Sequence, residues 1–148
     1  MTLDPEKFLP YRLNRLAEAV SADIRPVYKE RFGMNRPEWR VLVALADLGP
    51  TTAKAICGHS AQHKTKVSRA VAALERRRWL KRATDAADRR FEILSMTPAG
   101  ARAYSDLVGP MTAREDLILD RLSRADRAAL DRALSALETA MGVGPERS

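Results

Sequence analysis

The 148-residue sequence is poor in cysteine, histidine and aromatic residues, with one Cys, two His and eight Trp, Tyr or Phe in all. Cys57 has no partner, so an internal disulfide is excluded, which fits a reducing cytoplasm. No apolar run approaches the roughly 20 residues that span a bilayer, the longest candidate being Val41 to Ala46. The segment from Met1 to Lys7 is polar and lacks the apolar core of a signal peptide. These absences predict a cytoplasmic protein with no membrane partner.

Residues for catalysis and metal binding are also scarce. Cys57, His59 and His63 lie close together in the sequence, but their spacing matches no common zinc signature and a fourth ligand is not obvious. The chain has no glycine-rich phosphate loop and no evident Ser-His-Asp set. We therefore predict no enzyme, no cofactor and no metal site. Cys57 is expected to be a small buried residue beneath a helix, and not an oxidant-sensing thiol.

Positive charge is what the chain has in excess. The formal net charge is +7, and the segment from Thr52 to Arg90 holds 11 Lys or Arg against three acids. The rest of the chain is therefore nearly neutral, and so concentrated a basic segment predicts a binding site for a polyanion. Charge alone leaves a membrane surface or an acidic protein as alternatives. An RNA-binding module is a further alternative, although few of the aromatic residues that stack on single-stranded bases lie in this segment.

Apolar residues recur at three- and four-residue steps along most of the chain, which predicts helices. The predicted helices run from about Pro10 to Arg31, Asn35 to Leu48, Ala53 to about His59, about His63 to Arg77, Thr97 onward, and Ser123 to Met141. Proline removes a backbone donor from a helix, so we expect Pro26 to kink or restart its helix and Pro110 to bend its own. Asn35 is expected to cap its helix, with the Glu38 side chain reaching back to the cap backbone.

Two of these helices are short and are joined by a tight turn at Gly58 to Gln62, which is typical of a helix-turn-helix. Strand-like segments follow at Leu80 to Thr84 and at Phe91 to Met96, with a turn from Asp85 to Arg89 between them. The predicted fold is therefore mainly α with a small β-wing, a winged helix-turn-helix.

The order of these elements and several motifs resemble the multiple-antibiotic-resistance regulator (MarR) family, from about Leu9 to Met141. The most specific segment is Asp85-Ala86-Ala87-Asp88-Arg89-Arg90 followed by Leu94 to Gly100. It resembles the family's wing motif running into a threonine-x-x-glycine helix start. Residues Lys64 to Glu75 resemble its recognition helix, and Pro37 to Leu42 resemble the start of its second helix.

Two positions depart from the family pattern. Arg78 stands just after the recognition helix, where the family usually has glycine, and a left-handed cap conformation there is costly for any other residue. Gln62 replaces an apolar residue that is usual in the turn.

The first helix and the last two carry more apolar surface than a small helix-turn-helix can cover, which predicts a homodimer. A monomer whose long helices fold onto each other is the alternative. We expect one domain over residues 1–148, with dimerisation helices at 8–34 and 101–141 and a winged-helix DNA-binding lobe at 35–100.

The partner that this fold implies is double-stranded DNA, since a helix fits the major groove and its N-terminal residues meet base edges. Six residues in the first two turns of the second short helix are the candidates for this contact: His63, Lys64, Thr65, Lys66, Ser68 and Arg69. Arg69 and Lys64 are the strongest among them for base or phosphate contacts. By contrast, Arg76 to Arg78 are expected to form a merely solvated helix face.

In the wing, Asp88 and Arg90 are two residues apart on a strand-like segment and so share a face. The resemblance implies that the acid orients the arginine as the wing enters the minor groove. Arg89 is the alternative groove residue, with Arg90 holding the wing. Lys81 and Arg82 on the preceding strand are expected to contact phosphates.

The resemblance also implies a transcription regulator, often a repressor on a pseudo-palindromic operator, released by a small effector bound between the dimer helices and the DNA lobe. Four residues lie on the helices that would border such a pocket: Tyr11, Arg15, Trp39 and Arg40. An arginine beside aromatic rings suits an aromatic carboxylate or its CoA thioester. Core packing of Trp39 and a structural salt bridge of Arg40 are the alternatives.

Overall fold

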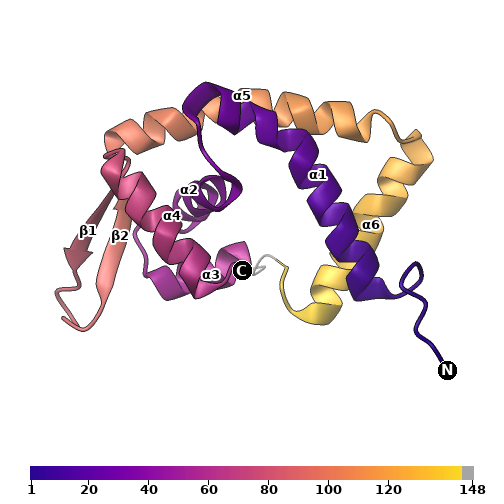
Figure 1. Cartoon of the computed structure of the whole chain (residues 1–148), viewed down its shortest axis with the longest axis horizontal. Coiled ribbons are helices and arrows are strands. Elements are labelled where there is room, and N and C mark those ends of the chain that lie inside the picture. Colours follow the sequence, from indigo (N-terminus) through magenta and orange to yellow (C-terminus); the bar gives the residue numbers. More distant parts are fainter. Residues whose placement is uncertain (145–148) are drawn as a thin grey trace. The chain divides into compact units, whose positions relative to one another are not determined.

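The computed structural model describes residues 1–144 (Figure 1). The elements within that range are α1 (Leu9–Phe32), α2 (Arg36–Leu48), α3 (Ala53–Ser60), α4 (Lys64–Arg76), β1 (Leu80–Thr84), β2 (Glu92–Met96), α5 (Pro98–Leu119) and α6 (Arg124–Met141). The mainly α fold with a small antiparallel wing is therefore confirmed. The chain divides into two compact units, residues 1–112 and 113–148, and α5 crosses the boundary between them.

Polar side chains cap the starts of α2 and α3, as predicted for Asn35. The side chain of Asn35 accepts a hydrogen bond from the Glu38 backbone N–H at 3.0 Å, and Thr52 caps α3 in the same way. Each cap satisfies one of the backbone donors that a helix start leaves unpaired. The expected restart of the first helix is wrong, because α1 continues without a break through Pro26. Helix α5 likewise runs through Pro110.

A single apolar core holds α2, α3, α4 and the root of the wing together. Its most deeply buried side chains are Tyr28, Met34, Val41, Leu42, Ile56, Val67, Leu74, Leu80, Leu94 and Leu107. Burying one large aliphatic side chain of this kind stabilises a fold by about 1.5–3 kcal/mol. The core thus fixes α4 against α2 and leaves the opposite face of α4 in solvent.

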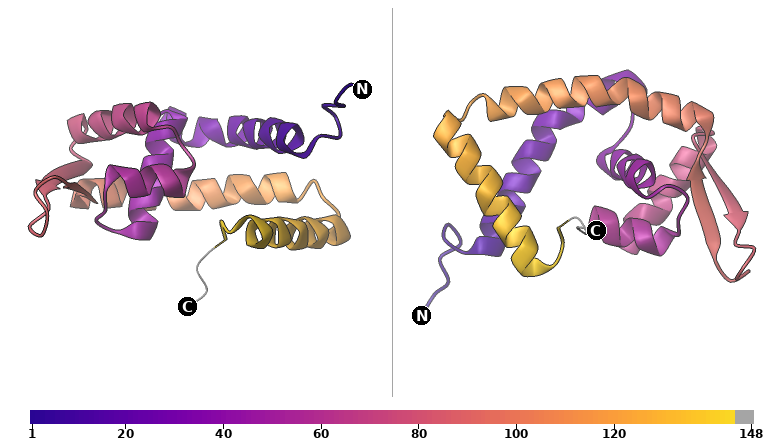
Figure 2. Two further views of the ribbon diagram at one scale, coloured as in Figure 1. Left: turned by 90° about the horizontal axis from the view of Figure 1, so that it is seen from below. Right: turned by 180° about the vertical axis from the view of Figure 1, so that it is seen from behind.

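The two strands form an antiparallel hairpin, which Figure 2 shows from two sides as an arm whose turn lies away from the helices of the first unit. The register pairs Leu80 with Met96 and Thr84 with Glu92. The prediction that Phe91 begins the second strand is wrong by one residue, since Phe91 precedes β2 and is half exposed. A backbone bridge between Thr51 and Leu94 ties β2 to the segment before α3, with N–H···O distances of 2.9 and 2.7 Å.

The junction between α4, β1 and α5 explains two sequence features together. Arg78 has a φ of +62°, so it adopts the left-handed conformation that usually selects glycine. Its carbonyl accepts a hydrogen bond from the Thr97 hydroxyl at 2.6 Å, and the Trp79 carbonyl accepts from the Thr97 backbone N–H at 2.9 Å. A Cβ on Gly100 would overlap the Trp79 carbonyl oxygen. The threonine-x-x-glycine start of α5 therefore holds the turn at Arg78 and Trp79, because Thr97 donates to both carbonyl groups and Gly100 leaves room for the second.

The expectation of a merely solvated face at Arg76 to Arg78 is wrong for Arg77. Its guanidinium donates to the Phe32 carbonyl at 2.7 Å and stacks over the Trp79 ring at 5.0 Å. It also lies 3.7 Å from the carboxylate of Glu38, which is 8% exposed. Glu38 therefore turns toward the end of α4, and the expected contact of its side chain with the Asn35 backbone is not made. Arg77 ties the ends of α1 and α4 to α2.

The second unit contains the end of α5 and all of α6. Ser123 caps α6 by accepting from the Asp126 N–H at 3.1 Å. Arg127 lies 3.6 Å from Asp120. No residue of α6 is buried, and the apolar side chains of Leu130, Leu134 and Met141 are exposed. None of the helices within residues 1–144 has the length and apolarity needed to cross a membrane.

Candidate nucleic-acid interface

The turn between α3 and α4 joins the two helices of the helix-turn-helix. Ala61 occupies it with a φ of +51°, again in the left-handed region. The Gln62 side chain donates to the Ser60 hydroxyl at 3.1 Å, and that hydroxyl donates to the Ile56 carbonyl at 2.6 Å. The polar residue that departs from the family pattern is therefore used in a hydrogen-bond chain that closes the corner.

Helix α4 begins at a histidine cap. The Nδ1 atom of His63 accepts a hydrogen bond from the Thr65 N–H at 3.2 Å, so His63 has a structural role at the helix start. The other five candidates on the helix are exposed, while Val67 and Val71 on the opposite side are buried. The sequence thus predicted correctly which side of the helix faces solvent.

The exposed candidates lie on two flanks of α4. Lys64 and Ser68 line a groove of about 790 Å³ between α3, α4 and the hairpin, which we call the wing groove. Lys66 and Arg69 line a hollow of about 530 Å³ between α4 and the start of α2. Thr65 lines neither. The helix therefore presents a basic side chain on either flank, which suits a helix that contacts both walls of a DNA groove.

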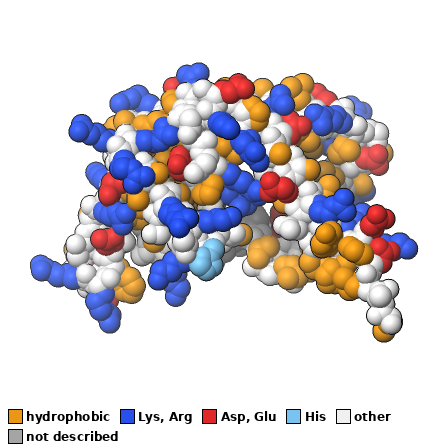
Figure 3. Space-filling model, viewed as in Figure 1, with side chains coloured by type: hydrophobic (Ala, Val, Ile, Leu, Met, Phe, Trp, Pro, Cys, Tyr) orange, Lys and Arg blue, Asp and Glu red, His pale blue; other side chains and the backbone are white. Residues whose placement is uncertain are grey.

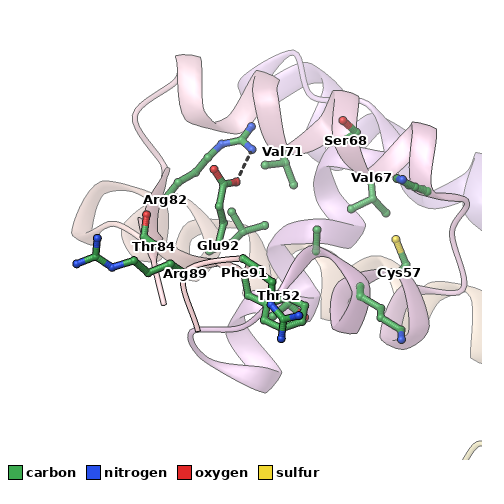
Figure 4. A pocket seen from close by; sticks show the side chains of 15 residues that line it. Thr52, Cys57, Val67, Ser68, Val71, Arg82, Thr84, Arg89, Phe91 and Glu92 are labelled. Carbon is green, nitrogen blue, oxygen red and sulfur yellow. Dashed lines mark hydrogen bonds and ion pairs between the residues drawn. The ribbon is translucent and has the colours of Figure 1, made fainter. Parts of the chain in front are cut away.

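The wing groove has an apolar floor and a basic rim (Figure 4). Val67, Val71 and Leu94 form its floor. The basic residues that line it are Lys54, Lys64, Arg82, Arg89 and Arg90. Lys54, in the first turn of α3, was not among the sequence candidates, and its only signal was membership of the basic segment. Cys57 also lines this groove and packs against the core, but it is only half-buried and so less buried than predicted.

At the tip of the wing, Asp88 holds Arg90. The Asp88 carboxylate accepts from the Arg90 backbone N–H at 3.0 Å, from Nε at 3.0 Å and from Nη2 at 2.7 Å. The hydrogen bonds from the Arg90 side chain and backbone lower the pKa of Asp88. The carboxylate is therefore ionised at neutral pH, and the pair weakens only as the pH falls through that lowered pKa.

Arg89 differs from Arg90 in its contacts. Within residues 1–144 no ion pair or side-chain hydrogen bond holds Arg89. Figure 4 shows its side chain extending away from the Arg82–Glu92 pair. The pairing at the tip thus gives Arg90 a fixed geometry and leaves the Arg89 guanidinium available to a partner.

The two basic residues of β1 also differ. Lys81 is exposed. The Arg82 guanidinium is bound to two carboxylates, with Nε 2.8 Å from Glu75 Oε2 and Nη1 3.2 Å from Glu92 Oε2. The hydrogen bond that Arg82 donates to Glu75 is the main reason why the pKa of Arg82 is raised. Figure 3 shows Lys and Arg side chains gathered over α3, α4 and the hairpin on the face in view.

A small cavity of about 140 Å³ lies between α1, α2 and Met111 of α5. Trp39 and Arg40, two of the four effector candidates, line it. Trp39 stacks between Tyr28 and Tyr104, with ring centroids 6.1 and 5.8 Å apart.

Arg40 differs from the neighbouring arginine in the same cavity. Burial, and then the nearby charge of Arg36, lowers the pKa of Arg40. Arg36 is paired with Glu18 at 2.7 Å, whereas Arg40 has no carboxylate partner among the described residues. Within residues 1–144, the salt bridge offered as an alternative for Arg40 is therefore not made.

Tyr11 and Arg15 lie elsewhere. Both are exposed on the N-terminal part of α1, with the Arg15 guanidinium 6.0 Å from the Tyr11 ring centre. They do not line the cavity of Trp39 and Arg40. Within residues 1–144, no group of three or more His, Cys, Asp and Glu is arranged to hold a metal ion.

A helix-turn-helix that leads directly into a hairpin, with basic residues on the free side of its second helix, defines a winged helix-turn-helix protein. Residues 32–90 match the model of the MarR family. Over this segment the chain is thus similar to MarR-family transcriptional regulators. No curated protein matches it in sequence.

Solved structures share this fold over nearly the whole chain. BpsR of Bordetella bronchiseptica, whose DNA binding is regulated by 6-hydroxynicotinic acid, is 20% identical with a TM-score of 0.78, over 93% of this chain and 98% of that one. A MarR-family regulator from Silicibacter pomeroyi is 22% identical with a TM-score of 0.75, over 98% and 99%. CouR from Rhodococcus jostii RHA1, bound to p-coumaroyl-CoA, is 16% identical with a TM-score of 0.76, over 99% of each chain. At these identities the likeness shows the fold.

Proposed function

We propose that the protein is a dimeric repressor that binds a pseudo-palindromic operator in duplex DNA, and so acts in the cytoplasm with the chromosome. The observation that carries this proposal is the basic, exposed side of α4 beside a wing whose Arg90 is fixed by Asp88. Rigidly held donors bind DNA without a further ordering cost. Two recognition helices in a symmetric dimer would meet half-sites about one helical turn apart.

Individual residues take different roles in this proposal. Arg69 and Lys64, on the two flanks of α4, contact base edges or phosphates. Thr65 and Ser68 supply shorter donors. At the wing, Arg90 enters the minor groove in the geometry that Asp88 sets, and Arg89 and Lys81 contact phosphates.

The experiment begins with selection of bound sequences from a pool of random 30-base-pair duplexes, so that the protein itself picks out its operator. Affinity for the selected duplex is then measured by fluorescence anisotropy. Arg69→Ala and Arg90→Ala should each weaken binding by about tenfold or more, as expected for loss of one direct contact at roughly 1–3 kcal/mol. Arg89→Ala should lower the salt dependence and leave sequence preference intact.

Arg102→Ala on α5, an exposed arginine outside this surface, is the matched control and should bind like the parent protein. If the selection returns no duplex, the proposed function is wrong. If Arg69→Ala and Arg90→Ala both bind as tightly as the parent, the assignment of contacts is wrong although DNA binding stands.

The proposed effector is an aromatic carboxylate or its CoA thioester, bound at the cavity of Trp39 and Arg40. No carboxylate within residues 1–144 pairs with the half-buried Arg40 guanidinium, and the stacked rings beside it offer a flat apolar wall. Among the structural neighbours, BpsR responds to 6-hydroxynicotinic acid and CouR binds p-coumaroyl-CoA. Helix α2 also packs on α4 and is tied to it by the Glu38–Arg77 pair. A ligand that displaces α2 would therefore displace the recognition helix and separate the half-sites.

The effector is tested on the complex with the selected duplex. Hydroxybenzoates, hydroxycinnamates and p-coumaroyl-CoA are titrated in turn, and release of the duplex is followed by anisotropy. Arg40→Gln should raise the concentration needed for release by at least about tenfold, since a charged hydrogen bond contributes roughly 1.5–3 kcal/mol. Arg15→Gln, outside the cavity, should release at the parent concentration. Equal responses of both variants would contradict this site.

A further inference from the structure

The hairpin of the wing has few apolar anchors. In β1 only Leu80 is buried, and the four residues after it are exposed. In β2 only Leu94 is buried, where the backbone bridge to Thr51 also holds the strand. Apolar packing therefore fixes the base of the hairpin, and the outer half of β1 needs another contact to hold it against α4.

Arg82 supplies that contact. It lies in the middle of β1, whereas Glu75 is the next-to-last residue of α4 and Glu92 is the first residue of β2. The guanidinium bonds to Glu75 at 2.8 Å through Nε and to Glu92 at 3.2 Å through Nη1. One side chain thus joins the recognition helix to both strands of the wing, as Figure 4 shows for Arg82 and Glu92. The planar guanidinium suits two carboxylates at once, which a lysine ammonium does less well.

We propose that Arg82 is a positioning residue that sets the wing at a fixed angle to the recognition helix, and not a phosphate contact. This inference rests on the proposed DNA-binding function. Two of the three guanidinium nitrogens are already bonded to carboxylates, and one cation between two anions gives the cluster a net negative charge. Such a cluster does not attract phosphate. It holds in place two elements that must contact neighbouring grooves at the same time.

The two roles of Arg82 predict opposite changes in DNA affinity when Glu75 and Glu92 are neutralised. If Arg82 contacts phosphate, the double substitution Glu75→Gln/Glu92→Gln removes two negative charges beside DNA and frees the guanidinium, so affinity should rise. If Arg82 positions the wing, the same variant loosens the hairpin. Ordering the hairpin on binding then costs free energy, so the affinity for DNA should fall. We expect the double variant to bind the selected duplex about tenfold more weakly.

Arg82→Lys provides a second test, because it keeps the charge and loses the two-carboxylate bridge. A phosphate contact would survive this change with its salt dependence intact. As a positioning residue, Arg82→Lys should lose affinity for the selected duplex to about the same extent as Glu75→Gln/Glu92→Gln. Hydrogen exchange of the β1 and β2 amides should be faster in both variants, which reports the loosened wing without any DNA.

Two matched controls separate charge from position. Lys81→Gln, the neighbouring exposed cation, should show the phosphate pattern, with the slope of log affinity against log salt reduced by about one. Glu30→Gln on α1 removes an acid far from the wing in sequence and should not weaken binding. Tighter binding by Glu75→Gln/Glu92→Gln, or unchanged binding by Arg82→Lys, would overturn the inference. Failure of the parent protein to bind any duplex would overturn the proposed function itself.

Discussion

Arg78 and Ala61 hold left-handed backbone conformations without being glycine, with φ of +62° and +51°. For an ordinary residue this conformation costs roughly 1–2 kcal/mol. At Arg78 the surrounding bonds enforce it, because its carbonyl is held by the Thr97 hydroxyl and the next carbonyl by the Thr97 N–H. Arg78 thus holds a strained conformation between α4 and β1. Relief of this strain should change the free energy of unfolding.

Arg78→Gly should raise the free energy of unfolding by about 0.5–1 kcal/mol. Relief of the left-handed strain exceeds the roughly 0.4–1 kcal/mol that glycine adds to the entropy of the unfolded chain. Urea unfolding followed by circular dichroism measures the change. Arg76→Gly, two residues earlier at the end of α4, removes the same charge from a helical position and should instead lower stability, by about 0.5–1 kcal/mol. Equal effects at the two positions would mean that the backbone at Arg78 is not strained.

Elements of this chain follow closely from local sequence signals. The cap at Asn35 is the predicted one, and α3 begins at the predicted Ala53. The first strand has the predicted bounds, and the second begins one residue later, because Phe91 belongs to the turn. These signals act within a few residues of each other, so a single sequence contains them.

The contacts between helices and strands could not be predicted from the sequence. The spacing of Arg77 matches the exposed side of α4 and so predicts a solvated residue, but its partners Phe32 and Glu38 are distant in the sequence. The partners of Arg82 likewise come from α4 and β2. Periodicity tells which side of a helix is free, and it does not tell which neighbouring element that side meets.

The residues of the candidate site could be predicted from the sequence, but their arrangement between neighbouring elements could not. The exposed candidates on α4 follow from the helix period alone. The Asp88–Arg90 pair is found, but the prediction that it lies on a strand-like segment is wrong, because both residues lie in the turn before β2, where the Asp88 carboxylate accepts from the Arg90 backbone and side chain. The division of Lys64 and Arg69 between two flanks depends on where the wing and α2 pack. That packing is tertiary, as is the exclusion of Arg15 from the cavity of Arg40.

At the scale of the whole molecule, two helices carry apolar side chains that the chain leaves in solvent. On α1 these include Leu9, Leu13, Leu16 and Val20, and on α6 they are Leu130, Leu134 and Met141. Helix α6 has no buried residue at all among those described. An isolated helix of this length is marginal in water, since most helical stability in proteins comes from packing. In the proposed dimer, a second copy of the chain buries these rows and supplies the symmetric pair of recognition helices.

Leu130→Glu/Leu134→Glu should therefore convert a dimer into a monomer at micromolar concentration, because each glutamate places a charge in the apolar row. Analytical ultracentrifugation measures the mass. Loss of the linked second half-site should weaken binding to the selected duplex by about 10²–10⁴-fold, the usual gain from joining two binding modules. Arg132→Glu, on the opposite side of the same helix, changes the charge without entering the row and should remain dimeric. A parent protein that sediments as a monomer would exclude the homodimer, and a dimeric double variant would place the interface outside the row of α6.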